Sequence, residues 1–115
     1  MSSDIEKLRF IEEKVNDLFS FREKFSTIVD LLDDKMGFDA SLMCLLQIGE
    51  TLHKLKDSVY ASQLPIKGSY DVRNFIAHDY EGVNKAIVED IIRFHIPELK
   101  KILNTIFEDI GNRLD

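Results

Sequence analysis

Apolar residues recur every three or four positions along nearly the whole chain, and this spacing allows few folds other than packed helices. The first such run consists of Ile5, Leu8, Ile11, Val15 and Leu18. The residues between them are largely charged, which leaves a polar face for solvent. Only two prolines and five glycines occur in 115 residues, a composition that suits long helices better than a turn-rich β fold. The sequence therefore predicts an all-α protein.

The middle of the chain contains a second helical region with an unusually wide apolar face. Gly37 is expected to cap the end of the preceding helix, and Asp39 is expected to cap the start of this one. The wide face predicts a central position in the fold. Gly49 lies on that face although glycine costs about 1 kcal/mol in a helix interior. We therefore expect close packing at Gly49, against a neighbouring helix or a second subunit.

The last part of the chain predicts two more helical regions. Residues 57–69 are looser, and a short helix is expected to begin between Ser69 and Asp71 and to end near His78. Another begins near Val83, and Pro97 is expected to kink it or to start a new helix. Together these regions predict a four- to five-helix antiparallel up-down bundle, formed by one domain over residues 1–115.

The charge of the chain bears on which ligands it can bind. Fifteen basic and twenty-one acidic residues give a net charge of −6, and no segment forms a basic nucleic-acid platform. Any action on RNA must therefore depend on a local site. The N-terminal residues show no targeting pattern, and no apolar run approaches the roughly 18 residues that span a bilayer. We expect a cytoplasmic protein without membrane association.

Cys44 is the only cysteine, so no disulfide can form within the chain. It lies in the apolar run 42–46, which predicts a small buried hydrophobic residue. A catalytic thiol would need a polar and partly exposed environment.

One segment concentrates polar groups of distinct chemistry, with Arg73, Asn74, His78 and Tyr80 inside eight residues. Histidine, whose ordinary pKa is about 6.5, can accept the proton of a ribose 2′-hydroxyl or protonate a leaving oxygen. Arginine can hold a phosphate, and asparagine can orient either group. Residues five apart on a regular helix are separated by about 140°. Arg73 and His78 would therefore converge only if the helix ended near His78 or if two chains met there.

Two other interpretations of nearby residues compete with this one. Arg73 can instead pair with Asp71 or Asp79 and leave His78 as an ordinary surface residue, and the residues alone give both interpretations equal weight. Glu50-x-x-His53 has the spacing of a ligand pair in a di-iron bundle, but such a site needs two more inward glutamates that the sequence does not identify. We therefore expect no metal.

The segment 73–80 resembles the R-x4–6-H motif of HEPN ribonucleases, in the R-N-x-x-x-H-x-Y form of HepT-like toxins. Residues 46–50 resemble the Q-x-I-G-E stretch of that family, and residues 81–84 resemble its G-V-D turn. Residues 96–100 resemble its L-P-E-L-K stretch. The resemblance covers about residues 40–103, and the ordered set of motifs is far more specific than R-x4-H alone.

The resemblance implies a metal-independent endoribonuclease toxin that needs no cofactor. Arg73, Asn74 and His78 would be its catalytic residues, with Glu50 and Asp79 as supporting residues. The family implies a homodimer that brings two Arg–His pairs into one cleft. The substrate would be an RNA such as a tRNA or an mRNA.

The resemblance also implies a partner, a minimal nucleotidyltransferase antitoxin of a type VII-like toxin–antitoxin pair. That enzyme would silence the toxin by transferring AMP to Tyr80, because added negative charge would repel RNA phosphate. Tyr80 immediately precedes the turn at Glu81 and Gly82, so its hydroxyl is expected to be accessible. Two alternatives remain: a non-catalytic helical subunit that binds substrate for a nucleotidyltransferase, and a metal-binding bundle at Glu50 and His53.

Overall fold

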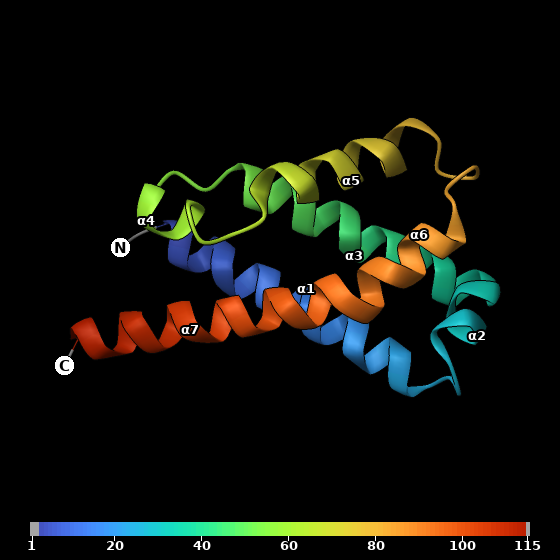
Figure 1. The fold of residues 1–115 in the computed structure, drawn as a ribbon, viewed down its shortest axis with the longest axis horizontal. Coiled ribbons are helices and arrows are strands. Elements are labelled where there is room, and N and C mark those ends of the chain that lie inside the picture. The colour runs from blue at the N-terminus through green and yellow to red at the C-terminus, as the bar shows by residue number, and fades with distance from the viewer. Residues whose placement is uncertain (1–2, 115) are drawn as a thin grey trace.

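The computed structural model describes residues 3–114, which form helices and contain no β-strand. The four long helices are α1 (Ser3–Glu23), α3 (Lys35–His53), α5 (Ile66–His78) and α7 (Ile96–Leu114). The short elements are α2 (Ile28–Asp33), α4 (Ser58–Ala61), α6 (Lys85–Asp90) and a π-helical turn (Ile91–His95). Successive long helices run in alternate directions, so α1 begins at the end of the molecule where α7 finishes (Figure 1). The predicted all-α helical bundle is confirmed.

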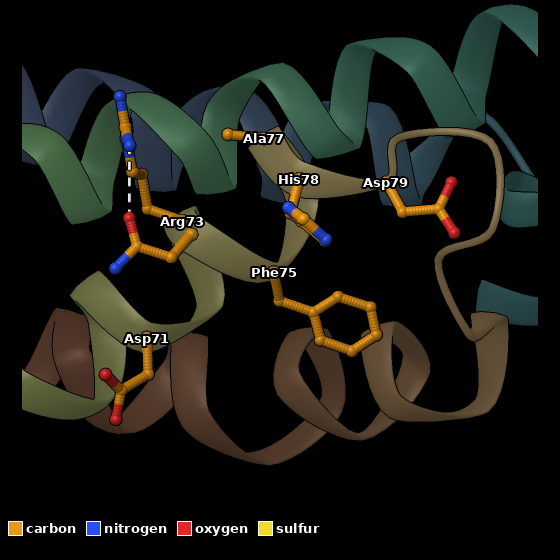
Figure 2. A pocket seen from close by; sticks show the side chains of 7 residues that line it. Asp71, Arg73, Phe75, Ala77, His78 and Asp79 are labelled. Atoms are coloured by element: carbon orange, nitrogen blue, oxygen red, sulfur yellow. Dashed lines mark hydrogen bonds between the residues drawn. The ribbon is translucent and has the colours of Figure 1, made fainter.

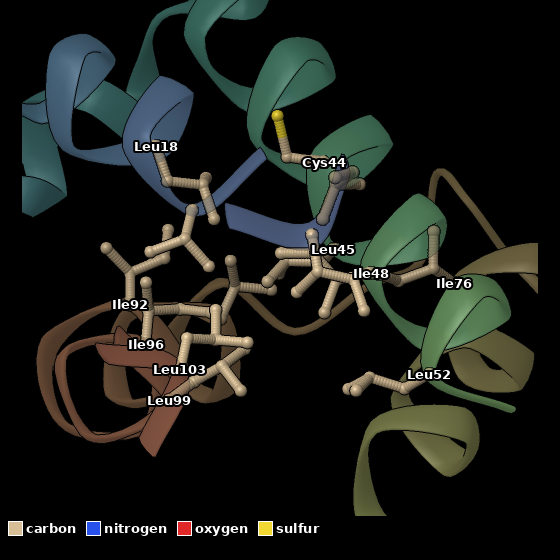
Figure 3. Close-up of a cluster of buried hydrophobic side chains, with 14 of the residues drawn as sticks. Leu18, Cys44, Leu45, Ile48, Leu52, Ile76, Ile92, Ile96, Leu99 and Leu103 are labelled. Carbon is tan, nitrogen blue, oxygen red and sulfur yellow. The ribbon is translucent and has the colours of Figure 1, made fainter. Parts of the chain in front are cut away.

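Helix α3 occupies the centre of the bundle, as its wide apolar face predicts. It packs against α1 on one side and against α5 on the other. The buried side chains that join the long helices include Leu18, Leu45, Ile48, Leu52, Leu99 and Leu103 (Figure 3). Helix α5 buries only Ile76. This helix therefore lies on the outside of the bundle, with most of its surface open to solvent.

The boundary before α3 differs from the sequence expectation. Gly37 does not end a helix; it lies buried in the first turn of α3, where its N–H donates to the Asp34 carboxylate at 2.8 Å. Asp34, not Asp39, is therefore the N-cap of α3. A Cβ at position 37 would press against the carbonyl and side chain of Leu31. Close approach of α2 and α3, and not helix termination, explains this glycine.

The start of α5 also differs from the sequence expectation, whereas the starts of α6 and α7 agree with it. Helix α5 begins at Ile66, directly after Pro65, so Gly68 lies inside the helix and not before it. Asn84 caps α6 by accepting from two backbone N–H groups. Helix α7 begins at Ile96, so Pro97 lies in its first turn, which is one of the two outcomes that the sequence predicts; the preceding turn, residues 91–95, is a π-helix. This wider turn accommodates a residue that cannot donate a backbone hydrogen bond.

Cys44 is buried, as its apolar neighbourhood predicts. Burial raises the pKa of its thiol to about 11, so the reactive thiolate is disfavoured at neutral pH. None of the helices in the described part of the chain is both long and apolar enough to cross a membrane.

Candidate active site

The segment that concentrates polar groups lies on the exposed surface of α5. It borders a depression of about 710 Å³ lined by Asp71, Arg73, Asn74, Phe75, Ala77, His78 and Asp79 (Figure 2). Every lining residue belongs to α5 or directly follows it, and all except Arg73 are exposed. The chain therefore builds one wall of a site and leaves the opposite side open.

Arg73 is held at the inner edge of this depression by α3. Its Nη2 donates to Glu50 Oε1 at 2.7 Å, and its Nη1 donates to Asn74 Oδ1 at 3.1 Å. The side chains of Arg73 and Glu50 are 28% and 38% exposed. Guanidinium carries five N–H donors, so donors remain for a phosphate after these two bonds. The Nε of Arg73 is buried and has no hydrogen-bond partner within the described residues.

Gly49 makes this arrangement possible. A Cβ at position 49 would lie 2.7 Å from the Cβ of Arg73 and would also press against the carbonyl of Ser69. The expectation of close packing at Gly49 is confirmed, and the neighbour is α5 of the same chain. Glu50, on the next position of α3, is thereby brought to the guanidinium.

His78 is the last residue of α5, where the sequence predicts the helix to end. It is exposed, and its side chain forms no hydrogen bond or ion pair within residues 3–114. Asp79 follows it and accepts a hydrogen bond from the Gly82 N–H at 3.1 Å, which closes the turn after α5. Arg73 and His78 border the same depression, but no contact joins them within one chain.

The Tyr80 hydroxyl is engaged in a hydrogen bond, which the expectation of an accessible hydroxyl did not include. The hydroxyl donates to the backbone oxygen of Asp39 at 3.1 Å, and the ring packs edge-on against Phe38 with 6.4 Å between centroids. The side chain turns toward the start of α3 and is absent from the lining of the depression. Burial, with a smaller contribution from the Asp39 carboxylate, raises the pKa of Tyr80.

An aromatic pair beside Arg73 is not evident from the sequence. The rings of His53 and Tyr70 are stacked, with 3.8 Å between centroids and 12° between planes. The Arg73 guanidinium carbon lies 5.7 Å from the Tyr70 centroid. One sequence feature could have suggested this pair. Glu50 and His53 are three residues apart on one helix, and Tyr70 and Arg73 are three residues apart on the helix that packs against it.

The Glu50–His53 pair is therefore occupied by other contacts. Glu50 binds Arg73 and His53 stacks on Tyr70, and neither faces a cluster of further ligands. Throughout residues 3–114, no three His, Cys, Asp or Glu side chains gather into a potential metal site.

The fold and the segment together define a class of small helical proteins that carry R-N-x-x-x-H-x-Y on an exposed helix end. A family model described as "Ribonuclease HepT-like" matches residues 11–106. The chain belongs to this HepT-like ribonuclease family, and the predictions of the family and of a ribonuclease are confirmed at that level.

Two relatives agree with this family. The chain is 28% identical to "Putative RNase MJ1216" of Methanocaldococcus jannaschii, over 90% of this chain and 86% of the relative. It is 30% identical to "Putative RNase MJ0127" of the same organism, over 87% of this chain and 84% of the relative. No solved structure is a significant match.

Proposed function

We propose that this protein is a metal-independent endoribonuclease toxin whose active site is the depression on α5. One observation carries the proposal: Arg73 and His78 border the same open surface, with Arg73 fixed by α3 and His78 unengaged. A phosphate-binding cation and a potential proton-transfer group thus face the same solvent-filled space. We further propose that the protein acts in the cytoplasm.

The chemistry follows from the properties of these groups. His78 accepts the proton of a ribose 2′-hydroxyl as the 2′ oxygen attacks the adjacent phosphorus. The bond from phosphorus to the 5′ oxygen breaks, and that oxygen takes up a proton, which leaves a 2′,3′-cyclic phosphate. Arg73 stabilises the negative charge that develops on the phosphate oxygens. Asn74 orients the guanidinium through the hydrogen bond described above.

A second copy of the chain is proposed as the missing wall of the site. All lining residues come from one stretch of chain, and Phe75 within it is 41% exposed although it is a large apolar side chain. A two-fold axis beside α5 would cover Phe75 and face two Arg73–His78 pairs toward each other. Sedimentation at micromolar concentration tests this, with a dimer expected; a monomer that retains full cleavage activity would contradict it.

Control by a nucleotidyltransferase antitoxin is proposed at Tyr80, as in a type VII-like pair. The tyrosine oxygen would attack the α-phosphorus of ATP, lose its proton and release pyrophosphate. Because the hydroxyl is bound to Asp39, it must first leave that carbonyl. Each AMP adds about one negative charge two residues from His78, where RNA phosphate must bind. Mass spectrometry after co-expression with the antitoxin tests this, and an unmodified Tyr80 in a fully silenced complex would contradict it.

One observation favours a second function, a non-catalytic subunit that binds substrate for a nucleotidyltransferase. Glu50 neutralises Arg73, and Asp71 and Asp79 add negative charge to the same depression. Such a site repels RNA more than a basic one does. In that case the protein would bind its partner and leave RNA intact.

The deciding experiment is RNA cleavage by the unmodified protein in EDTA, beside His78→Ala. We expect cleavage by the wild type and a loss of about 10²- to 10⁴-fold in the variant. His95→Ala is the matched control, because His95 is also exposed but lies on the π-helical turn away from the depression. Equal activity of His78→Ala and wild type would refute the proposed role of His78.

A further inference from the structure

We propose that the stacked rings of His53 and Tyr70 form a subsite for a base of single-stranded RNA, next to the phosphate site at Arg73. The inference rests on the ribonuclease function proposed above and adds where the RNA strand continues. Single-stranded RNA is commonly bound by stacking bases on aromatic or histidine rings, beside cationic groups that hold the backbone. Both kinds of group occur here on adjacent turns of α3 and α5.

The stacked rings lie close to the Arg73 guanidinium. On α3, Glu50 precedes His53 by three residues, and on α5 Tyr70 precedes Arg73 by three. Three residues of helix rise about 4.5 Å. The Arg73 guanidinium carbon lies 5.7 Å from the centroid of the Tyr70 ring. A phosphate on Arg73 would therefore place a neighbouring base within reach of the stacked rings.

The stack is open on one side. Tyr70 is half-buried and borders Arg73, whereas His53 is exposed. A flat ring lying 3.8 Å from a parallel partner uses only one of its faces in that contact. The outer face of His53 can therefore receive a base and extend the stack by one more ring.

The charge around the stack is also suitable. Lys54 lies one residue after His53 and Lys56 three residues after it; both are exposed, and neither side chain forms an ion pair within residues 3–114. They lie at the end of α3, beyond His53 from the Arg73–Glu50 pair. These two lysines favour a phosphate backbone that continues past the cleavage site, and they act against the Asp4 carboxylate, which accepts from the Lys56 and Asp57 N–H groups at the same end of α3.

A purely structural role for the stack predicts a different result. If His53 and Tyr70 only fasten α3 to α5, their loss affects every RNA equally through the position of Arg73. If they bind a base, their loss matters only where the RNA has a base to stack. Removing one base from the RNA and one ring from the protein separates the two cases.

The experiment measures binding of a short single-stranded RNA to the His78→Ala chain, which leaves the RNA intact. One base at a time is replaced by an abasic ribose. We expect one position at which the abasic RNA binds about 5- to 150-fold more weakly, the range for one stacked base. Adding His53→Ala should weaken binding of the intact RNA similarly, and the abasic ribose should then cause no further loss. Tyr70→Phe should bind like the parent, because it keeps the ring.

The control variant is His95→Ala, which should retain the full effect of the abasic position. If abasic RNA loses the same affinity with and without His53, the subsite is refuted. Cleavage of intact RNA by the wild type is measured in parallel. If the wild type cleaves RNA but abasic RNA loses the same affinity with and without His53, only the subsite is overturned. If the protein neither cleaves nor binds RNA, both the subsite and the proposed ribonuclease function are overturned.

Discussion

The two ends of the segment 73–78 are built differently. Arg73 is half-buried, lies against Gly49 and is bound to Glu50, all through contacts with α3. His78 ends the helix in solvent, and its side chain has no hydrogen-bond partner in the described part of the chain. The protein thus fixes the group that would hold a phosphate and leaves free the group that would move a proton.

This difference indicates that a second molecule, RNA or another chain, must orient His78 but not Arg73. A cation held by a packed helix is already oriented before RNA arrives, so little side-chain entropy is lost on binding. A free histidine gains a fixed orientation only from substrate or from another chain. Both ends should therefore be needed for cleavage, while only the Arg73 end should matter for stability.

The largest expected effect is a loss of cleavage activity in variants of both residues, combined with a loss of stability in the Arg73 variant alone. Arg73→Ala and His78→Ala should each lower cleavage by about 10²- to 10⁴-fold. His78→Ala should change the free energy of unfolding by less than about 0.5 kcal/mol, because the residue is exposed. Arg73→Ala should lower it by about 1 kcal/mol through the lost ion pair and stem packing. Single-turnover cleavage and denaturant unfolding measure both; equal stability of the two variants would remove the proposed difference between the ends.

The packing beneath Arg73 gives the next effect. Gly49→Ala should destabilise the protein by about 1–3 kcal/mol, because the added Cβ lies 2.7 Å from that of Arg73. Gly68→Ala is a matched control on α5, since nothing lies within 4 Å of a Cβ there. That variant should gain up to about 1 kcal/mol from helix propensity. Thermal unfolding measures both, and a neutral Gly49→Ala would show that α5 can move away from α3.

The turn after His78 has its own anchor, which Tyr80→Phe tests. Removing the hydroxyl breaks its bond to the Asp39 carbonyl and should cost about 1 kcal/mol of unfolding free energy. The ring keeps its contact with Phe38, so the fold and the cleavage activity should remain. The same variant should escape silencing by the antitoxin. Unchanged stability would mean that the hydroxyl bond contributes little to the turn.

The smallest expected effect is a dependence on pH of the unfolding free energy that Tyr80 contributes. Because the folded state raises the pKa of Tyr80, the neutral phenol is the form that folding favours. Its contribution to stability is complete below the ordinary tyrosine pKa of 10.0 and is lost as pH rises through the folded value. The unfolding free energies of wild type and Tyr80→Phe should therefore converge at high pH.

Cys44 must be removed from that comparison, because burial raises its thiol pKa from 9.0 to about 11. Cys44 therefore loses its own contribution over an overlapping range of pH, with the same sign. Both proteins should be measured in a Cys44→Ala background. A constant difference between them across the whole range would contradict the stated cause of the Tyr80 pKa shift.

The helices and the position of the segment were predictable because they depend on local patterns. Apolar spacing identifies α1, α3 and α7, and α5 ends at His78, where the sequence predicts the helix to end. Glycine destabilises a helix interior, and its presence at position 49 therefore predicted a close contact there. These features need only the residue and its near neighbours in sequence.

The contacts that orient the site were not predictable in the same way. The Glu50–Arg73 ion pair joins residues 23 apart, and the Tyr80–Asp39 hydrogen bond joins residues 41 apart. A turn suggests exposure for Tyr80, but the ring direction depends on where α3 starts. That start was misplaced, because Asp34 rather than Asp39 is its cap. The hydrogen bond between Tyr80 and Asp39 therefore depends on how two distant segments pack, which the turn after His78 does not reveal.

The most direct test of the central claim is the chemical identity of the new RNA ends. Transfer of a 2′-hydroxyl proton to His78, with Arg73 on the phosphate, must leave a 2′,3′-cyclic phosphate and a free 5′-hydroxyl. Mass spectrometry of the products formed by wild-type protein in EDTA measures this. We predict cyclic phosphate ends that disappear in His78→Ala. Products with 5′-phosphate ends, or cleavage that EDTA abolishes, would contradict the proposed site and mechanism.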